Sequence, residues 1–247
     1  MSERDFFKAK INDLITRFED GEEIVFSSFL TVEEALMANN LCSKYHIPHI
    51  FLGGYAECER KILAISSLDE TKIKERCPIV LLKIECAELS SISNRDVLGA
   101  LMGSGIRREM LGDIIIRQGV AAFFALNQIS EFLIQNISTI GRFKVKLAVA
   151  DEQFEIPPPV YEYQRVTAAS LRLDAIVSSV SHISRDRASE LIENRMVQIN
   201  HMPSEKKTKE IHAGDCLVVR GVGKWIIDEC GELSKKGRVV LRCRKYI

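Results

Sequence analysis

The sequence predicts an α+β protein with three domains. Helix-like and strand-like hydrophobic patterns alternate over the first 150 residues, three prolines follow at Pro157 to Pro159, and two short helical patterns and a strand come after them. The chain has 247 residues, of which 46% are hydrophobic and 28% are charged, so it is long enough for two or three packed domains. We therefore expect an amino-terminal domain over residues 1–75, a middle domain over 76–150, a proline-rich linker over 151–165 and a carboxy-terminal domain over 166–247.

The amino-terminal domain is expected to be a small α/β domain. Apolar residues recur at helical spacing over residues 2–19. Thr31 and Glu34 have the spacing of a capping box, and Pro48 cannot continue a helix, so a second helix is expected from Thr31 to about Tyr45. Short strands are expected over residues 50–52 and 61–65. No part of this domain resembles a catalytic motif.

The middle domain shows the order strand, helix, strand, strand, helix, strand. The strands are expected over residues 79–86, 114–116, 120–125 and 143–149, and the helices over 94–102 and 129–137. This order is that of ferredoxin-like and RNA-recognition-motif domains. RNA-recognition motifs stack bases on exposed aromatic residues, but here the first strand has none and only one of the adjacent Phe123 and Phe124 can face outward. We expect these phenylalanines to pack in the core.

A glycine-rich segment lies between Leu98 and Asp113. Its glycines allow backbone amides to approach a phosphate, and Arg107 and Arg108 add positive charge at the same place. A bend after a helix, with solvated arginines, explains the segment equally well. Both interpretations remain open at this stage.

Positive charge is concentrated near the carboxyl end although the formal net charge is zero. Residues 165–247 carry 16 Lys and Arg against 10 Asp and Glu, and the six charged residues after Glu232 are all basic. This asymmetry is typical of a surface that binds a polyanion. For the tail alone, a solvated charged strand is an equally good explanation.

Two short helices and a strand are predicted at the start of this basic region. The first helix has an apolar stripe made of Leu173, Ile176, Val177 and Val180, and the second has one made of Ala188, Leu191 and Ile192. Ser184 can cap the second helix with its side-chain oxygen. On a helical wheel Arg185 and Arg187 lie near opposite edges of the second stripe, so both guanidinium groups should be free to meet phosphate. Residues 196–200 alternate as a strand.

This order of motifs resembles the alpha-L RNA-binding module, which is named after small-subunit ribosomal protein S-four. The resemblance covers Leu171 to Arg220 and implies that four residues contact the sugar-phosphate backbone, namely Arg172, Ser184, Arg185 and Arg187. The chain departs from the module at Arg195 and His201, where the family usually has glycine, and an arginine in a left-handed turn would be strained. Further basic residues would extend the RNA surface: Arg220, Lys224, Lys235, Lys236 and Arg238.

Motifs in the first half of the chain extend the resemblance to a whole family. The segments over residues 53–60, 98–101, 105–109 and 112–114, together with the carboxy-terminal module, are similar to the bacterial YlmH family. The resemblance implies an amino-terminal domain, an RNA-recognition-like middle domain and an alpha-L module. It also implies binding to rRNA, tRNA and the large ribosomal subunit carrying peptidyl-tRNA, in quality control of stalled translation. The family is linked with cell-division gene neighbourhoods, which suggests cell-division proteins as further partners.

Alpha-L modules also accompany catalytic domains, so an enzyme is an alternative. Pseudouridine synthases contain Arg-Leu-Asp, which occurs here as Arg172 to Asp174, but no catalytic domain follows it. Asp174 is expected instead to be a helix-end anion or an ion-pair partner. The nucleotide-binding signatures of a tyrosyl-tRNA-synthetase-like enzyme and the glycine-rich cofactor loop of an RNA methyltransferase are missing.

No metal site, cofactor or membrane segment is expected. The best metal candidates are Cys42, His46, His49 and Cys58, but Pro48 separates the two histidines awkwardly. The amino terminus does not read as a signal peptide, and the apolar stretch over residues 114–126 is too short to span a bilayer. Seven cysteines without a Cys-x-x-Cys pair suggest reduced thiols in a cytoplasm.

The predicted function is therefore cytoplasmic, non-catalytic binding of rRNA and tRNA through their backbones, with no small-molecule substrate. An RNA-modifying enzyme, similar to a pseudouridine synthase and with unrecognised catalytic residues in 1–150, is one alternative. A cell-division adaptor with secondary RNA binding is another. Trp225 lies beside two isoleucines and is expected in the core. His182 is expected to face solvent, and its place near basic residues leaves contact with phosphate as an alternative.

Overall fold

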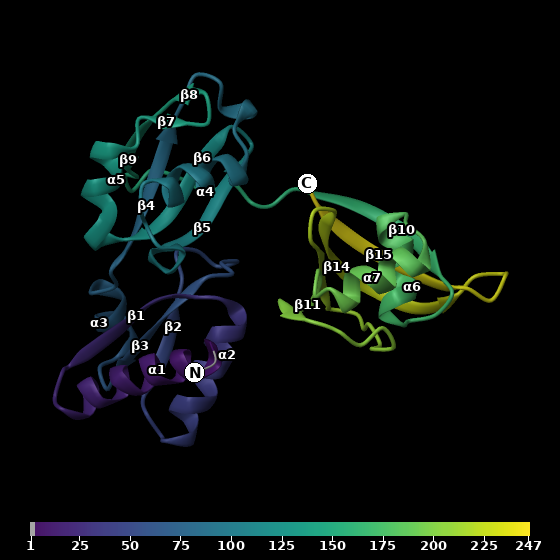
Figure 1. The fold of residues 1–247 in the computed structure, drawn as a ribbon, viewed down its shortest axis with the longest axis horizontal. Coiled ribbons are helices and arrows are strands. Elements are labelled where there is room, and N and C mark those ends of the chain that lie inside the picture. The colour runs from purple at the N-terminus through teal and green to yellow at the C-terminus, as the bar shows by residue number, and fades with distance from the viewer. Residues whose placement is uncertain (1–2) are drawn as a thin grey trace. The chain divides into compact units, whose positions relative to one another are not determined.

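The computed structural model describes residues 3–247 and shows two compact units, one up to Pro157 and one from Pro158 onward. Both units contain helices and sheets (Figure 1), so the predicted α+β class is confirmed. The division lies within the three prolines, inside the segment that the sequence indicates as a linker. None of the helices in the described residues is long and apolar enough to cross a membrane.

The first unit begins with a three-stranded antiparallel sheet covered by two helices. Its elements are α1 (Glu3–Glu19), β1 (Ile24–Leu30), α2 (Val32–Lys44), β2 (His49–Leu52), β3 (Lys61–Ser66) and α3 (Glu70–Glu75), with strand order β1-β3-β2. The predicted capping box is present, since the Thr31 hydroxyl accepts the Glu34 N–H and the Glu34 carboxylate accepts the Thr31 N–H. Ser2 of the predicted first helix lies outside the described residues. Strand β1 was not predicted, because Ser27 and Ser28 interrupt its apolar pattern at a shift in register.

The second half of this unit follows the predicted order of elements. It contains β4 (Ile79–Glu85), α4 (Asn94–Gly103), β5 (Leu111–Arg117), β6 (Val120–Leu126), α5 (Ser130–Asn136), the hairpin β7 (Thr139–Ile140) and β8 (Phe143–Lys144), and β9 (Lys146–Val149). Short 3₁₀ helices lie at Leu89–Ser91, Arg108–Met110 and Asn127–Ile129. The sheet order is β5-β6-β4-β9. The strand expected over residues 143–149 is divided into β8 and β9 at Val145, whose N–H bonds to the carbonyl of Ser138.

Both faces of this four-stranded sheet are buried. Phe123 packs with α4 and α5 on one face, and Phe124 packs on the other face against Tyr55 and residues of the first sheet such as Phe29. Adjacent strand residues point to opposite faces, so the two phenylalanines occupy two different cores. The prediction that both are core residues is confirmed. The expected division at residue 75 is bridged by this second core, and the two expected domains form one compact unit.

The second unit is a six-stranded antiparallel sheet with two helices. Its elements are β10 (Tyr161–Ala168), α6 (Leu173–Ser181), α7 (Arg185–Glu193), β11 (Val197–Ile199), β12 (Met202–Pro203), β13 (Cys216–Val219), β14 (Gly223–Leu233) and β15 (Val239–Tyr246), in the order β10-β15-β14-β13-β11-β12. The two helices and β11 lie where the sequence predicts them. Strand β10 takes the last five residues of the expected linker, because it pairs with β15 along its whole length.

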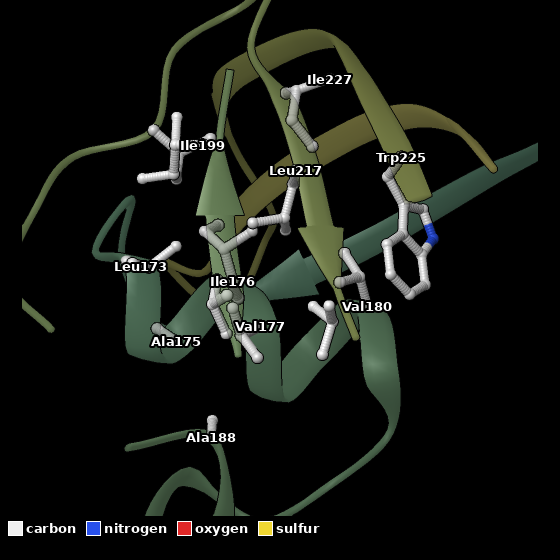
Figure 2. Packing of buried hydrophobic residues seen from close by; sticks show 14 of the residues in the cluster. Leu173, Ala175, Ile176, Val177, Val180, Ala188, Ile199, Leu217, Trp225 and Ile227 are labelled. Carbon is white, nitrogen blue, oxygen red and sulfur yellow. The ribbon is translucent and has the colours of Figure 1, made fainter. Parts of the chain in front are cut away.

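The core of the second unit joins these helices to one face of the sheet. Figure 2 shows Leu173, Ile176, Val177 and Val180 of α6 packed with Leu217, Trp225 and Ile227 of the strands. Trp225 is buried, and its indole N–H donates to the side-chain oxygen of Gln164 at 3.1 Å. The predicted apolar stripe and the predicted core position of Trp225 are both confirmed.

The turns on either side of β11 are left-handed although no glycine occupies them. The φ angles are 58° at Arg195, 51° at Asn200 and 64° at His201. The Asn200 amide stabilises its turn, because it donates to Asp215 at 2.8 Å and accepts the N–H of Cys216 at 2.8 Å. The chain therefore keeps the glycine-like backbone and accepts strain of roughly 1–2 kcal/mol per non-glycine residue.

Candidate nucleic-acid interface

Helix α7 begins at Ser184 and presents two arginines to solvent. The Ser184 hydroxyl accepts the backbone N–H of Arg187 at 3.2 Å and so caps the helix. Ala188 and Ile192 are buried, whereas the side chains of Arg185 and Arg187 are 50% and 61% exposed. The predicted orientation of both arginines is confirmed. Arg187 also forms an exposed ion pair with Glu190 at 2.6 Å, which costs little to break.

A single carboxylate, that of Asp174, holds two of the candidate arginines together. Asp174 lies in the first turn of α6, and its side chain is only 7% exposed. Arg172 donates to it through Nε and Nη2, each at 3.2 Å, and Arg185 donates from the start of α7 through Nη2 at 2.6 Å. The backbone N–H of Ala175 is a further donor, at 2.9 Å. The predicted role of Asp174 as an ion-pair partner is confirmed.

The charge of Asp174 depends on these arginines. Burial raises the pKa of its carboxyl group, but the hydrogen bonds from Arg172 and Arg185 outweigh burial, and the pKa is lowered overall. Asp174 is therefore ionised at neutral pH. Each guanidinium carries five N–H donors, so both arginines keep donors for a phosphate while they bind Asp174. The Asp174 carboxylate thus orients two guanidinium groups at the surface and leaves part of their N–H donors available.

Beside the turn between α6 and α7 lies a shallow basic depression of about 420 Å³. Arg165, His182 and Arg238 line it together with small and apolar residues, and no carboxylate is among the residues that line it. His182 ends α6 two residues before Ser184, so the depression adjoins the start of α7. Sequence reasoning selected Arg238 and left phosphate contact open for His182, but it did not include Arg165. Arg165 was missed because it was assigned to the linker, and only its pairing with Arg242 in β15 shows that it belongs to a strand.

The remaining candidates of this unit do not gather at one place. Arg220 is exposed just after β13, and Lys224 lies at the start of β14. Lys235 and Lys236 are exposed in the turn after the same strand. Strand β14 has 11 residues, so these two ends are roughly 33 Å apart. Only the end with Lys235, Lys236 and Arg238 adjoins the turn before α7.

The first unit gives Arg108 a structural role in addition to the one expected. Its guanidinium donates to the carbonyl oxygens of Leu111 at 2.7 Å and Gly112 at 3.0 Å. Burial and, second, a neighbouring arginine lower the pKa of Arg108 to about 10. Nη1 of Arg108 thus has a structural role that the sequence did not indicate, whereas contact of its other donors with phosphate stays a prediction. Arg107 is well exposed and pairs with Glu109 at 3.2 Å.

The segments that carried the family resemblance contact one another inside the first unit. The carboxylate of Asp113 accepts the backbone N–H groups of Glu59 at 2.7 Å and Arg60 at 3.1 Å. Burial raises the pKa of Asp113. Arg60 in turn donates to the carbonyl oxygens of Leu111 and Phe29, both at 3.0 Å. These contacts tie the two sheets of the unit together and explain the motifs structurally.

No group of three or more His, Cys, Asp or Glu side chains that could hold a metal ion occurs within residues 3–247. His49, one of the candidate ligands, instead lies within hydrogen-bond distance of the Ile47 carbonyl at 2.8 Å and the Asn39 side chain at 3.2 Å.

Three comparisons with known proteins bear on this arrangement. Residues 74–153 match the family described as "Putative RNA-binding domain in YlmH". A relative from Bacillus subtilis (strain 168), named "Ribosome-associated protein quality control protein P2", is 27% identical over 214 residues, which are 86% of this chain and 83% of the relative. The solved structure of "Cell division protein ylmH from Streptococcus pneumoniae" is similar with a TM-score of 0.52 and 18% identity, over 63% of this chain and 97% of that chain. The resemblance to the YlmH family is confirmed.

The match to the YlmH domain spans the sheet β5-β6-β4-β9 and its two helices. Helices α4 and α5 cover one face of this sheet, and the first sheet of the chain covers the other. An RNA-recognition motif that binds RNA in the usual way uses a free sheet face. The matched domain, residues 74–153, has no such face, so RNA contacts at this domain would involve its edges or loops.

Proposed function

We propose that this chain is a non-catalytic RNA-binding protein of ribosome-associated quality control. It binds structured rRNA and tRNA, on the large ribosomal subunit that carries peptidyl-tRNA. The observation that carries the proposal is the pair Arg172 and Arg185, which Asp174 holds at the start of α6 and α7 with half of each side chain exposed. The name of the Bacillus subtilis relative and the match to a YlmH RNA-binding domain support the same role.

The second unit acts in this proposal as an alpha-L module with an added basic tail. Arg172, Arg185 and Arg187 contact the phosphates of a folded RNA, and the depression lined by Arg165, His182 and Arg238 receives a neighbouring phosphate. Contacts to phosphate position a protein without reading sequence, so the shape of the RNA must select the site. The first unit contains residues 74–153, which match the RNA-binding domain of YlmH, and it supplies further RNA contacts in this proposal.

Sedimentation with purified ribosomal subunits tests the proposal. The wild-type chain is mixed with large and small subunits, with and without bound tRNA, at low and moderate salt. We expect binding to the large subunit that depends on tRNA, and weaker binding of the Arg185→Ala/Arg187→Ala variant. The control is Arg95→Ala/Arg142→Ala, which removes two exposed arginines from the first unit. Equal loss in both variants would show a general charge effect and would contradict the proposed site.

A cell-division adaptor is the second candidate. Phe6 on α1 and Leu36 and Tyr45 on or next to α2 are large apolar side chains that are exposed to solvent. Phe6 also lines a depression of about 650 Å³ beside β1. A folded chain that binds neither ribosomal subunits nor RNA would favour this candidate. The enzyme alternative would need two carboxylates with opposed pKa shifts in one depression. The carboxylate of Asp113 has a structural role instead, because it accepts two backbone N–H groups.

A further inference from the structure

The face of the second sheet that is opposite to its helices carries three tyrosines. Tyr161 and Tyr163 lie two residues apart on β10, and Tyr246 lies directly opposite Tyr161 on β15. Arg244 lies directly opposite Tyr163. Residues that pair directly across an antiparallel sheet share a face, so these four side chains form one surface. We call Tyr161, Tyr163, Tyr246, Arg244 and Lys224 the tyrosine face.

This surface points away from the core of the unit. Gln164, which alternates with Tyr163, binds Trp225 on the core side, and Cys243, which alternates with Arg244, is buried in the core. Side chains alternate along a strand, so Tyr163 must face outward. Its side chain is accordingly 76% exposed. An aromatic ring that is exposed to this extent contributes little to stability.

Two cations lie over the other two rings. The Lys224 ammonium is 4.2 Å from the ring centroid of Tyr246, and the Arg244 guanidinium is 4.9 Å from that of Tyr161. The Tyr161 and Tyr246 rings are 4.9 Å apart and meet edge to face at 68°. The contacts described for residues 3–247 place no ring or cation over Tyr163. The tyrosine face therefore has one open ring beside two that are held in place by their neighbours.

Carboxylates offset part of the positive charge of this surface, which includes Lys224 and also Arg165, the partner of Arg242 on β10. Asp228 binds Arg244 at 2.8 Å, and Glu229 binds Arg242, the next outward residue of β15, at 2.6 Å. Arg185 and Arg187 at the start of α7 are also ion-paired, with Asp174 and Glu190, but they lie at the amino terminus of a helix, which favours anions. Attraction between charges and phosphates is thus weaker at the tyrosine face. A ligand with exposed aromatic bases gains affinity here from the rings in addition to the attraction of these cations.

We propose that the tyrosine face binds unpaired bases of single-stranded RNA by stacking, as a second RNA contact on this unit. The inference rests on the proposed RNA-binding function and adds a different ligand class to it, because the α7 arginines are proposed to grip folded RNA. Residues two apart on a strand are separated by about 6.6–6.8 Å, a spacing that an extended RNA strand can match with successive bases. Exposed aromatic rings with nearby cations are the usual platform for unpaired bases.

Fluorescence anisotropy with a labelled ten-nucleotide oligouridine tests this proposal, because uridines stack weakly on one another. A matched oligomer with abasic sugars keeps the phosphates and removes the bases. We expect Tyr163→Ala to weaken binding of oligouridine about tenfold and Tyr163→Phe, which keeps the ring, to bind almost as wild type does. Binding of the abasic oligomer should be weak and equal for all three proteins. The fluorescence of Trp225 verifies that each variant is folded.

Several outcomes overturn the proposal. Unchanged oligouridine binding by Tyr163→Ala excludes stacking on this ring, and equal losses in Tyr163→Ala and Tyr163→Phe indicate a hydroxyl contact instead. Unchanged oligouridine binding combined with weaker ribosome binding by Tyr163→Ala would show that the ring contacts a part of the ribosome other than unpaired bases. The Arg185→Ala/Arg187→Ala variant separates this inference from the proposed function. If that variant binds ribosomes as wild type does, the proposed function fails, whereas the oligouridine result still decides the tyrosine face.

Discussion

The Asp174 carboxylate and the Arg185 guanidinium lie 2.6 Å apart and join the first turns of two helices. Asp174 is nearly buried, and Arg185 is half exposed. One end of the contact is therefore part of the core, and the other end faces solvent at the proposed RNA surface. Stability and RNA binding should respond together to a change at Asp174.

Replacement of Asp174 by asparagine should destabilise the second unit. The neutral asparagine side chain cannot balance the positive charges of Arg172 and Arg185, and its NH2 group would be a donor that faces other donors. We expect a decrease of about 1–3 kcal/mol in the free energy of unfolding. Trp225 is the one tryptophan of the chain, so urea denaturation followed by tryptophan fluorescence reports on this unit. Asp186→Asn, at an exposed carboxylate in the first turn of α7, should change the free energy of unfolding by less than about 1 kcal/mol.

The difference in the free energy of unfolding between wild type and Asp174→Asn should also depend on pH. The pKa of Asp174 is lower in the folded protein than in the unfolded chain. A group of this kind contributes its stability above the unfolded pKa, about 3.9 for Asp, and loses it as pH falls through the folded pKa. We therefore expect a full difference at pH 7 and a smaller one below about pH 4. A difference that stays constant down to pH 2 would exclude this ionisation as its source.

Loss of two arginines from α7 should reduce the salt dependence of RNA binding. Each phosphate that a protein neutralises contributes about 0.7–0.9 to the slope of log affinity against log salt concentration. With tRNA as the probe, Arg185→Ala/Arg187→Ala should lower the magnitude of the slope by about 1.4–1.8. Arg95→Ala/Arg142→Ala should leave the slope unchanged. Weaker binding with an unchanged slope would mean that the α7 arginines act through the structure and do not contact phosphate.

Gly112 on β5 should not tolerate a side chain. A Cβ atom there would lie 2.8 Å from Cβ of Phe124 and 2.8 Å from the ring of Phe29, in the core between the two sheets. We expect Gly112→Ala to lower the free energy of unfolding of the first unit by about 1–3 kcal/mol, as in other overpacked cores. Gly99 in α4 is the matched control, because an added Cβ atom meets no atom within 4 Å there. Gly99→Ala should raise the free energy of unfolding of the same unit by about 0.5–1 kcal/mol. Far-ultraviolet circular dichroism in urea measures both.

Arg195 is strained, and its replacement by glycine should stabilise the second unit. Its φ of 58° suits glycine, and its exposed ion pair with Glu205 at 3.4 Å contributes little. We expect Arg195→Gly to raise the free energy of unfolding by about 1 kcal/mol. Arg195→Ala removes the ion pair but keeps the Cβ atom, so it should give no increase. Equal effects of the two substitutions would show that the turn is not strained.

Local patterns predicted the parts of the chain whose interactions are close in sequence. The Thr31 capping box, the apolar stripe of α6 and the exposed arginines of α7 all depend on residues within two helical turns, and each is confirmed. Strand β1 was missed because two serines replace its expected apolar residues. Strands β10 and β15 were not predicted as a pair because their alternation is weak and their partners are far apart in the sequence.

Only part of the candidate site was predicted from the sequence. Helix position indicated that Arg185 and Arg187 face solvent, and Arg172 was selected through the resemblance to the alpha-L module. The structural role of Arg108 follows instead from carbonyl groups that face it in the folded loop. The basic depression depends on contact between β10, the end of α6 and the turn before β15. The sequence pattern could not indicate this contact, because it gives periodicity within an element and no distance between elements.

The sequence by itself determined the α+β class, most helices, the basic second unit and the resemblance to the YlmH family, because these properties depend on composition and on short-range spacing. The tertiary structure alone decided that both faces of the middle sheet are buried, that Asp174 joins two arginines and that three tyrosines share the outer face of the second sheet. Each of these depends on strand register or on packing between distant segments, and a shift of register by one residue would reverse which side chains face solvent.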